Sequence, residues 1–421
     1  MKFQPPITVR AEVKTPLFIW DGDTISPLSF VVDGHQVHVL DSDRFFRVLA
    51  PQEQEAYLAW IEPTLDRLAR LDEQLERAGK NFDLRRQLNR DKRQVAAGLS
   101  VERFLRDRLG RDAAAFVKRA GCAAYSVPWA VRPGDDGFRG FIKEAGYRPY
   151  VPGTELKGAL RTSLLYTLLG QEQNYAALRH ELIKFREVFR GGALPREKVR
   201  SLTKIVEQVE GKALRGAKND AKYDLLKLVQ VSDGDLLTPA ALRVRALESV
   251  GTDRFTRTLA EALEPGTAFT FRLSLAAIKE SRRALQELGL ADLAVDNISM
   301  PRLLEASYQR SAAILEVERA YFQGQPAVLK EIDRLRAENR PDAPLLRLGT
   351  GQGFLSTTVD LRVRARDPQL YDQAIREGVS LQRRWRTQPG NFPKTRRTVS
   401  DGQRHPQTLP GWIKLAVTSA S

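Results

Sequence analysis

The chain has 421 residues, of which 67 are lysine or arginine and 52 are aspartate or glutamate, so its formal net charge is +15. Such a surplus of positive charge is typical of proteins that bind a polyanion such as nucleic acid. The single cysteine, Cys122, excludes an internal disulfide and a multi-cysteine zinc site. No stretch reaches the roughly 18 apolar residues of a membrane span and no apolar leader opens the chain, so we expect a cytoplasmic protein.

The first 120 residues predict a β scaffold with a helical insertion. Residues 7 to 19 are typical of a strand. Asp33-Gly34 lies between two β-rich runs, 28 to 32 and 35 to 40, and this pattern predicts a hairpin. From about 43 to 120 the apolar residues recur at helical spacing amid dense charge, which indicates an inserted helical block.

Residues 149 to 169 predict a helix whose first turns face a phosphate. The Pro152-Gly153 turn leads to Thr154, whose hydroxyl we expect to cap the helix. A capped helix start can bind anions through its free N–H groups and its dipole. Four leucines spaced four apart predict the face that packs on a core: Leu156, Leu160, Leu164 and Leu168.

Two cations and a glycine occupy the other face of this predicted helix. Lys157 and Arg161 are four residues apart, so their side chains lie one turn apart on one face. Gly158 costs a helix about 1 kcal/mol relative to alanine, which fits the close approach of a ligand or of another backbone. An amphipathic helix whose cations are only solvated is the alternative.

The rest of the chain alternates helical and β segments. Helices are predicted at about 171–230 and 276–338, and strands at 243–250, 268–275 and 411–417. Gly191-Gly192 and residues 211 to 216 are typical of loops within the first helical block.

Three alternating glycines, Gly349, Gly351 and Gly353, follow a short apolar run. Their spacing matches neither the dinucleotide fingerprint nor the phosphate loop of nucleotide-binding proteins, so no cofactor is expected. Backbone N–H groups beside such glycines can approach a phosphate chain, although a purely structural turn is also compatible with the pattern.

The segment from 381 to 404 has the strongest positive charge in the chain. Its only acid is Asp401, and Trp385 lies among its cations, where an indole ring can stack on a base. We therefore predict RNA contacts by Arg384, Lys394, Arg396 and Arg397. A solvated basic tail, or a patch for an acidic protein, is the alternative.

Residues suited to catalysis or metal binding are sparse. Asp21-Gly-Asp23 and Asp233-Gly-Asp235 place carboxylates close enough for a divalent cation, yet Asp-Gly pairs are more often turns. The four histidines form no convincing acid and base pair. We expect neither a metal site nor enzymatic activity.

Three motifs resemble segments of the RAMP superfamily of CRISPR effector subunits. Residues 150 to 162, YVPGTELKGALRT, look like its signature segment, residues 346 to 355 are similar to its glycine-rich loop, and residues 393 to 399 resemble its Pro-Lys-x-Arg-Arg segment. With Ser26-Pro27-Leu28 and residues 228 to 233, their order resembles the fifth-named subunit of the type III-A (Csm) complex.

The resemblance implies an α+β fold of ferredoxin-like, RRM-like RAMP domains with large helical insertions. The expected parts are residues 1–235, with insertions at about 43–120 and 171–230, and residues 236–421, with an insertion at about 276–338, the glycine-rich loop and the basic C-terminal segment.

The implied function is that of a non-catalytic subunit that caps the 3′ end of the crRNA filament and supports crRNA maturation and antiviral defence. Its implied partners are the crRNA, a backbone RAMP subunit, a small helical subunit and a host nuclease. The expected RNA-contacting residues are Gly153, Thr154, Lys157, Gly158, Arg161, Gly349, Gly351, Gly353, Arg384, Lys394, Arg396 and Arg397. A RAMP-type endoribonuclease that processes CRISPR RNA, or a scaffold that recruits a nuclease, remains open.

The sequence departs from these relatives at two places. Phe18-Ile19-Trp20 stands where relatives commonly have His-Ile-Gly, and we expect Trp20 to lie in the core rather than on a base. The catalytic aspartate of the backbone subunits lies in a mobile loop, whereas Asp33 is predicted in a tight turn, which argues against a catalytic role here.

Overall fold

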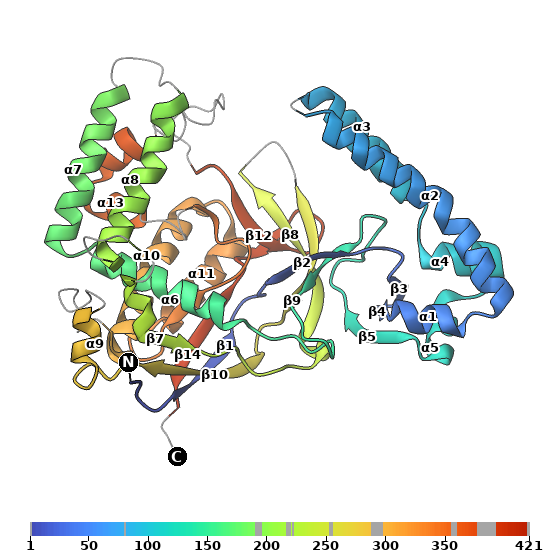
Figure 1. Cartoon of the computed structure of the whole chain (residues 1–421), viewed down its shortest axis with the longest axis horizontal. Coiled ribbons are helices and arrows are strands. Elements are labelled where there is room, and N and C mark those ends of the chain that lie inside the picture. Colours follow the sequence, from blue (N-terminus) through green and yellow to red (C-terminus); the bar gives the residue numbers. More distant parts are fainter. Residues whose placement is uncertain are drawn as a thin grey trace.

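The computed structural model describes residues 2–79, 81–189, 196–215, 220, 223–251, 256–287, 298–354, 360–376 and 393–418. These residues form a mixed fold of three β-sheets and many helices, shown in Figure 1. The α+β prediction is therefore confirmed.

The central sheet is antiparallel and brings the two ends of the chain together. Its strand order is β11 (Leu345–Arg347), β14 (Trp412–Val417), β1 (Ile7–Val13), β10 (Ala268–Leu275), β7 (Val229–Val231). Strand β1 alternates, with Val9, Ala11 and Val13 buried and Thr8 and Arg10 exposed, because successive side chains of a strand point to opposite faces. One face thus belongs to the main core.

The second sheet carries six strands and shares strands from both parts of the chain. Its order is β13 (Pro406–Thr408), β12 (Arg396–Ser400), β8 (Leu242–Val250), β9 (Arg257–Leu263), β6 (Phe138–Phe141), β2 (Trp20–Ile25). In the central sheet, too, β1 pairs with β10 and β14. Both sheets therefore contain strands from before and from after the predicted boundary at 235/236. The division into two parts stays a prediction.

The predicted strands at 243–250, 268–275 and 411–417 are confirmed as β8, β10 and β14, and the predicted first strand ends earlier, at Val13. Strand β9 has no counterpart among the predicted elements.

The predicted hairpin is confirmed as β3 (Phe30–Asp33) and β4 (Gln36–Leu40), which β5 (Ala123–Pro128) extends to a third sheet. Asp33 pairs with Gln36, so the two loop residues are Gly34 and His35, one position later than expected. Gly34 has a φ of 53°, a conformation that favours glycine.

The predicted helical insertion is confirmed as well. It contains α1 (Ser42–Val48), α2 (Pro51–Arg77), α3 (Phe82–Ala96), α4 (Val101–Arg103), η1 (Phe104–Arg108) and α5 (Ala113–Ala120). Phe45, Phe104 and Phe116 belong to a small core of its own. Helices α2 and α3 project from the body of the molecule, at the upper right of Figure 1.

The other described helices lie outside this insertion. They are α6 (Gly153–Leu168), α7 (Glu172–Phe189), α8 (Arg196–Arg215), η4 (Leu225–Leu228), η5 (Pro239–Ala241), α9 (Arg282–Glu287), α10 (Met300–Tyr321), α11 (Pro326–Glu338), α13 (Asp360–Arg366), α14 (Pro368–Leu370) and η7 (Tyr371–Arg376). Helix α6 packs on α10 and contacts β7. None of the helices in the described ranges is long and apolar enough to cross a membrane.

One loop prediction is wrong and another is untested. Helix α8 continues through Gly211 to Arg215, because Val209, Ala213 and Leu214 are buried on one helical face and tertiary packing outweighs the cost of one glycine. Gly191-Gly192 and Gly216 lie outside the described residues.

Candidate nucleic-acid interface

Helix α6 begins differently from the prediction. Its N-cap is Pro152, without a side-chain cap, so the predicted cap by Thr154 is wrong. Asp233, far along the chain, supplies the cap instead: its Oδ1 accepts a hydrogen bond of 2.7 Å from the Gly153 N–H. The carboxylate already occupies the positive end of the helix, so an anion would have to be held by side chains rather than by this N-terminus.

Gly153 is buried beneath the neighbouring strand end. A Cβ at this position would lie 2.7 Å from the carbonyl oxygens of Val231 and Ser232. The glycine is therefore required by the close approach of α6 to the end of β7. This position fixes the direction of α6 and contributes no surface to the candidate interface.

The inner face of α6 agrees with the prediction. Leu156, Leu160, Leu164 and Leu168 are all buried in the main core. Their spacing of four places them on one side of the helix, and Lys157 and Arg161 flank that side, where both are half-buried. Packing of the leucines thus fixes where the two cations point.

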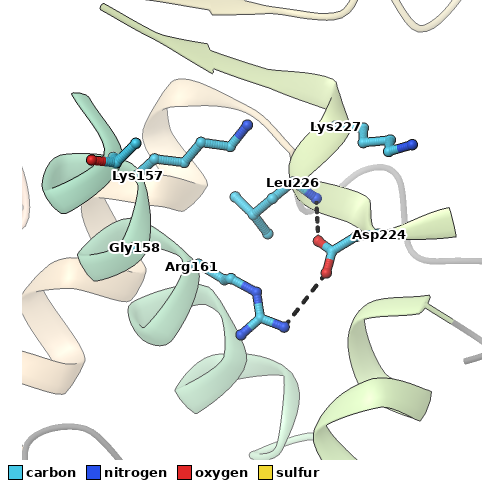
Figure 2. Close-up of a pocket in the computed structure, with 7 residues that line it drawn as sticks. Lys157, Gly158, Arg161, Asp224, Leu226 and Lys227 are labelled. Atoms are coloured by element: carbon cyan, nitrogen blue, oxygen red, sulfur yellow. Dashed lines mark hydrogen bonds and ion pairs between the residues drawn. The ribbon is translucent and has the colours of Figure 1, made fainter. Parts of the chain in front are cut away.

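The outer face of α6 forms one wall of an open pocket of about 340 Å³, shown in Figure 2. Its lining residues are Thr154, Lys157, Gly158, Arg161, Asp224, Leu226 and Lys227. Thr154 and Gly158 are exposed, whereas Lys157 and Arg161 are half-buried. Three cations and one carboxylate leave the pocket with two net positive charges.

Asp224 holds the opposite wall and orients Arg161. Its carboxylate accepts a 3.0 Å hydrogen bond from the Leu226 N–H and caps η4. The same carboxylate accepts a hydrogen bond of 3.1 Å from Arg215 of α8. Its oxygen also lies 3.5 Å from the Arg161 guanidinium. Figure 2 shows Arg161 pointing toward Asp224 across the pocket. Shared between two guanidiniums, this one carboxylate neutralises only part of their charge.

Lys157 has no such close partner among the residues that the structure describes. Burial lowers the pKa of its ammonium, and the more distant charge of Asp224 offsets this only in part. A partly buried ammonium is stabilised by an anion that replaces its lost hydration. An anion in this pocket would therefore meet a cation that the described residues neutralise only in part.

Gly158 lies between the two cations and opens the pocket wall. A Cβ at Gly158 would meet no described atom within 4 Å, so nothing within the described chain requires glycine here. The helix nevertheless bears the cost of glycine in its interior. The contact of a ligand with Gly158 stays a prediction.

The glycine-rich loop lies against the first turn of α6. The Gly349 N–H donates a 3.2 Å hydrogen bond to Oε2 of Glu155, and the Thr350 N–H donates to the Phe18 carbonyl at 2.8 Å. Two sequence motifs almost two hundred residues apart thus meet in space. The Gly349 N–H thus donates to a carboxylate of the chain, whereas the sequence predicts that it faces a phosphate.

All three loop glycines adopt left-handed conformations, with φ angles of 67°, 95° and 74°. A Cβ at Gly349 would overlap the Phe18 carbonyl, and one at Gly351 would lie 2.7 Å from Pro410. Gly353 is exposed, with no described atom near its missing Cβ. Gly349 and Gly351 therefore shape the loop.

Arg396 lies in the core, contrary to its predicted place on an RNA-binding surface. Its side chain is 8% exposed, donates to Glu318 of α10 at 2.7 Å and stacks over the Tyr321 ring at 4.3 Å. Glu318 also pairs with the buried Arg347 at 3.5 Å. The alternation of β12 explains the difference, since Arg396 shares its buried face with Thr398 and Ser400.

The other predicted cations of the C-terminal segment differ in their surroundings. Arg397 is half-buried, donates to Thr256 Oγ1 at 3.0 Å and has a pKa lowered by burial. A Cβ at Gly351 would contact Arg397 Cβ, which places this arginine beside the glycine-rich loop. Lys394 is half-buried, and Arg384 lies outside the described residues.

The two Asp-Gly-Asp sequences take part in local structure. Asp233 caps α6, and Asp235 accepts hydrogen bonds of 2.8 and 2.6 Å from the backbone N–H and hydroxyl of Thr270. Oδ1 of Asp21 accepts a hydrogen bond of 2.9 Å from the N–H of Asp23, within the irregular part of β2 between Trp20 and Thr24. These contacts give the carboxylates structural partners.

One further prediction concerns Trp20, two residues after Phe18. Phe18 is fully buried, and Trp20 is half-buried beside it with the Arg139 guanidinium 5.7 Å from its ring. The expected packing of Trp20 in the core is therefore partly confirmed.

The sequence did not point to Asp224, Leu226 and Lys227. A signal for them exists, because an aspartate followed by Leu-Leu-Lys-Leu is a plausible helix cap. Their proximity to α6, however, is a long-range contact that no local pattern encodes.

A family model described as the RAMP superfamily matches residues 10–298. No curated protein sequence matches the chain.

Two solved structures resemble the whole chain. One is a chain of a cryo-EM structure titled as a Csm-crRNA-target RNA ternary complex in a type III-A CRISPR-Cas system, with a TM-score of 0.61, 20% identity, and coverage of 98% of this chain and 100% of that one. The other is the crystal structure of T. onnurineus Csm5, with a TM-score of 0.61, 19% identity, and coverage of 96% and 99%. At this identity the likeness shows a shared fold.

Proposed function

The chain belongs to the RAMP superfamily, and from this membership we propose that it is a non-catalytic, crRNA-binding subunit of a type III-A CRISPR interference complex. Its fold matches Csm5 along nearly the full length of both chains, which supports the Csm5-like role. In that role it caps the 3′ end of the crRNA filament and supports crRNA maturation and antiviral defence. Its partners would be the crRNA, the last backbone RAMP subunit and the small helical subunit.

The observation that carries this proposal is the open basic pocket on α6. Lys157, Arg161 and Lys227 line it together with the glycine that leaves its wall open, Gly158. Ammonium and guanidinium groups bind phosphate oxygens, which carry no sequence information. Such a grip suits a guide RNA whose spacer sequence varies, because the protein must hold the backbone without reading the bases.

The surroundings of Asp33 support the non-catalytic part of the proposal. Its carboxylate pairs with Lys118 and lies 3.6 Å from His38. The hydrogen bond from Lys118 lowers the pKa of Asp33, so this group is a poor proton acceptor. An aspartate held in this way inside a hairpin differs from one in a mobile loop.

Crosslinking within the assembled ribonucleoprotein tests the proposal. The tagged chain would be co-expressed with a CRISPR array and the other complex subunits, purified, and irradiated, and the crosslinked nucleotides would be mapped. We expect crosslinks from residues of α6 to the 3′ portion of the crRNA. Crosslinks confined to the 5′ portion, or a complex that assembles without RNA contact by this chain, would contradict the capping role.

A cleavage assay tests the non-catalytic part. The purified chain would be incubated with repeat RNA, with and without Mg²⁺, and we expect no new product. A discrete product that depends on this chain would instead favour an endoribonuclease that processes CRISPR RNA.

A further inference from the structure

Helices α2 and α3 form an arm that stands away from the body of the molecule (Figure 1). The two helices are held together along one side of α3, where Leu88 is buried and Lys92 pairs with Asp72 of α2 at 2.7 Å. At 3.6 residues per turn, this side also contains Leu84 and Val95. The other side of α3 therefore faces away from α2.

The outward side of α3 carries a row of arginines. Arg86, Arg90 and Arg93 are separated by four and three residues, so their side chains follow one another along one face. All three are exposed. Among the described residues, none of their side chains takes part in a hydrogen bond or ion pair, in contrast to Arg85, whose side chain donates to the Leu75 carbonyl at 2.9 Å. The chain leaves these three charges available.

An exposed aromatic ring stands at the tip of the same row. Phe82 lies one turn before Arg86 on the same face, and it is 83% exposed. A large apolar side chain left this open is a sign of an interaction site. Aromatic rings beside a positively charged track are how proteins hold single-stranded nucleic acid, through base stacking and phosphate contacts.

The distribution of acids favours RNA on α3. Asp83, in the first turn, is the single acid on the outward face of α3. Helix α2 has the opposite character, with seven acids and three arginines in its sequence. A polyanion would therefore be attracted to α3 and repelled by its neighbour. An acidic protein surface could also meet the arginines, but a ring set in a row of cations offers a base-stacking platform beside phosphate-binding groups.

We propose that the outward face of α3, defined by Phe82, Arg86, Arg90 and Arg93, is a second RNA-binding surface. Its ligand is a single-stranded RNA, with phosphates on the three arginines and a base stacked on the ring. This proposal rests on the RNA-binding function proposed above and extends it beyond the α6 pocket. The arm then reaches a segment of RNA outside the body of the molecule.

The test uses the full chain and a fluorescein-labelled, unstructured single-stranded RNA. The variant Arg86→Glu, Arg90→Glu, Arg93→Glu is compared with the matched variant Arg67→Glu, Arg70→Glu, Arg77→Glu, which changes three exposed arginines of α2 by the same charge. Affinity is measured over a range of salt concentrations. Circular dichroism verifies that both variants keep the fold of the unsubstituted chain.

We expect the α3 variant to reduce the slope of log affinity against log salt by about 2, since each single-strand phosphate contact contributes roughly 0.7. The α2 variant should change the slope much less. Equal changes in the two variants would mean that only net charge matters, and an unchanged slope in the α3 variant would mean that the arginines contact no phosphate. Either result would overturn the proposal.

The ring is tested separately by Phe82→Ala and Phe82→Trp. Loss of stacking should weaken RNA binding by about fivefold or more in the alanine variant, whereas tryptophan should preserve it. Equal affinities for the two variants would remove the ring from the site. If the unsubstituted chain binds RNA and every α3 variant binds it with the same affinity and salt slope, the arm proposal fails and the RNA-binding function stands. If the unsubstituted chain binds no RNA, both fail.

Discussion

The N–H of Gly349 donates a hydrogen bond to the side chain of Glu155, 3.2 Å away and 194 residues earlier in the chain. This contact joins the glycine-rich loop to the first turn of α6, directly beside Thr154. The loop and the basic face of the helix are therefore neighbouring parts of one surface.

Replacing Glu155 should loosen this junction. In Glu155→Ala the Gly349 N–H loses its acceptor, and the first turn of α6 loses a favourable negative charge, so the free energy of unfolding should fall by about 1 kcal/mol. Glu155→Gln keeps a carbonyl oxygen that can accept the hydrogen bond, so its free energy of unfolding should fall by less than that of Glu155→Ala. Urea unfolding measures both variants. A Gln variant as unstable as the Ala variant would mean that the hydrogen bond contributes nothing.

Gly158→Ala should separate stability from binding. Its Cβ meets no described atom, so alanine should stabilise the helix by about 0.5–1 kcal/mol. The same methyl group would occupy the pocket wall and should weaken RNA binding. Thermal unfolding and RNA titration of the same preparation give both values. If the variant were more stable and bound RNA unchanged, the ligand would not approach this glycine.

Gly153→Ala serves as the contrast to Gly158→Ala. Its Cβ would lie 2.7 Å from two backbone carbonyls of the β7 end, so this variant should be destabilised. A stable Gly153→Ala protein would show that α6 packs differently from the arrangement described here.

Arg396 and Arg397 should differ although they are adjacent. Arg396→Ala removes a partner of the buried Glu318 and should lower the free energy of unfolding by about 3 kcal/mol, the lower end of the range for breaking a buried pair, because Arg347 still faces that carboxylate. Arg397→Ala loses one hydrogen bond from a half-buried group and should cost about 1 kcal/mol. Urea unfolding measures the free energy of unfolding of both variants. Equal decreases in the two variants would contradict the assignment of Arg396 to the core.

The regular elements were predictable because their patterns are local. The leucines of α6 recur every four residues, and the helix buries them as expected. The hairpin at Asp33 was evident from a glycine between two β-rich runs, and only the position of its two-residue loop shifted by one.

The errors arose where a distant residue supplied the partner. Threonine is a common helix cap, but the N-terminus of α6 is capped by Asp233, which lies just after β7. The charge pattern places Arg396 on a basic surface, but its guanidinium lies in the core because it pairs with Glu318, 78 residues earlier in the chain. Asp224 shapes the pocket through a contact with Arg161 across 63 residues, which no sequence window contains.

The salt dependence of RNA binding by the pocket variant tests the central claim most directly. Lys157→Glu, Arg161→Glu would be compared with Lys330→Glu, Arg340→Glu, which changes two exposed cations outside the pocket by the same charge. If the α6 face holds the RNA backbone, the first variant should lose affinity and its slope of log affinity against log salt should fall by about 1.4, while the control changes little. A pocket variant with the slope of the unsubstituted chain would contradict the account.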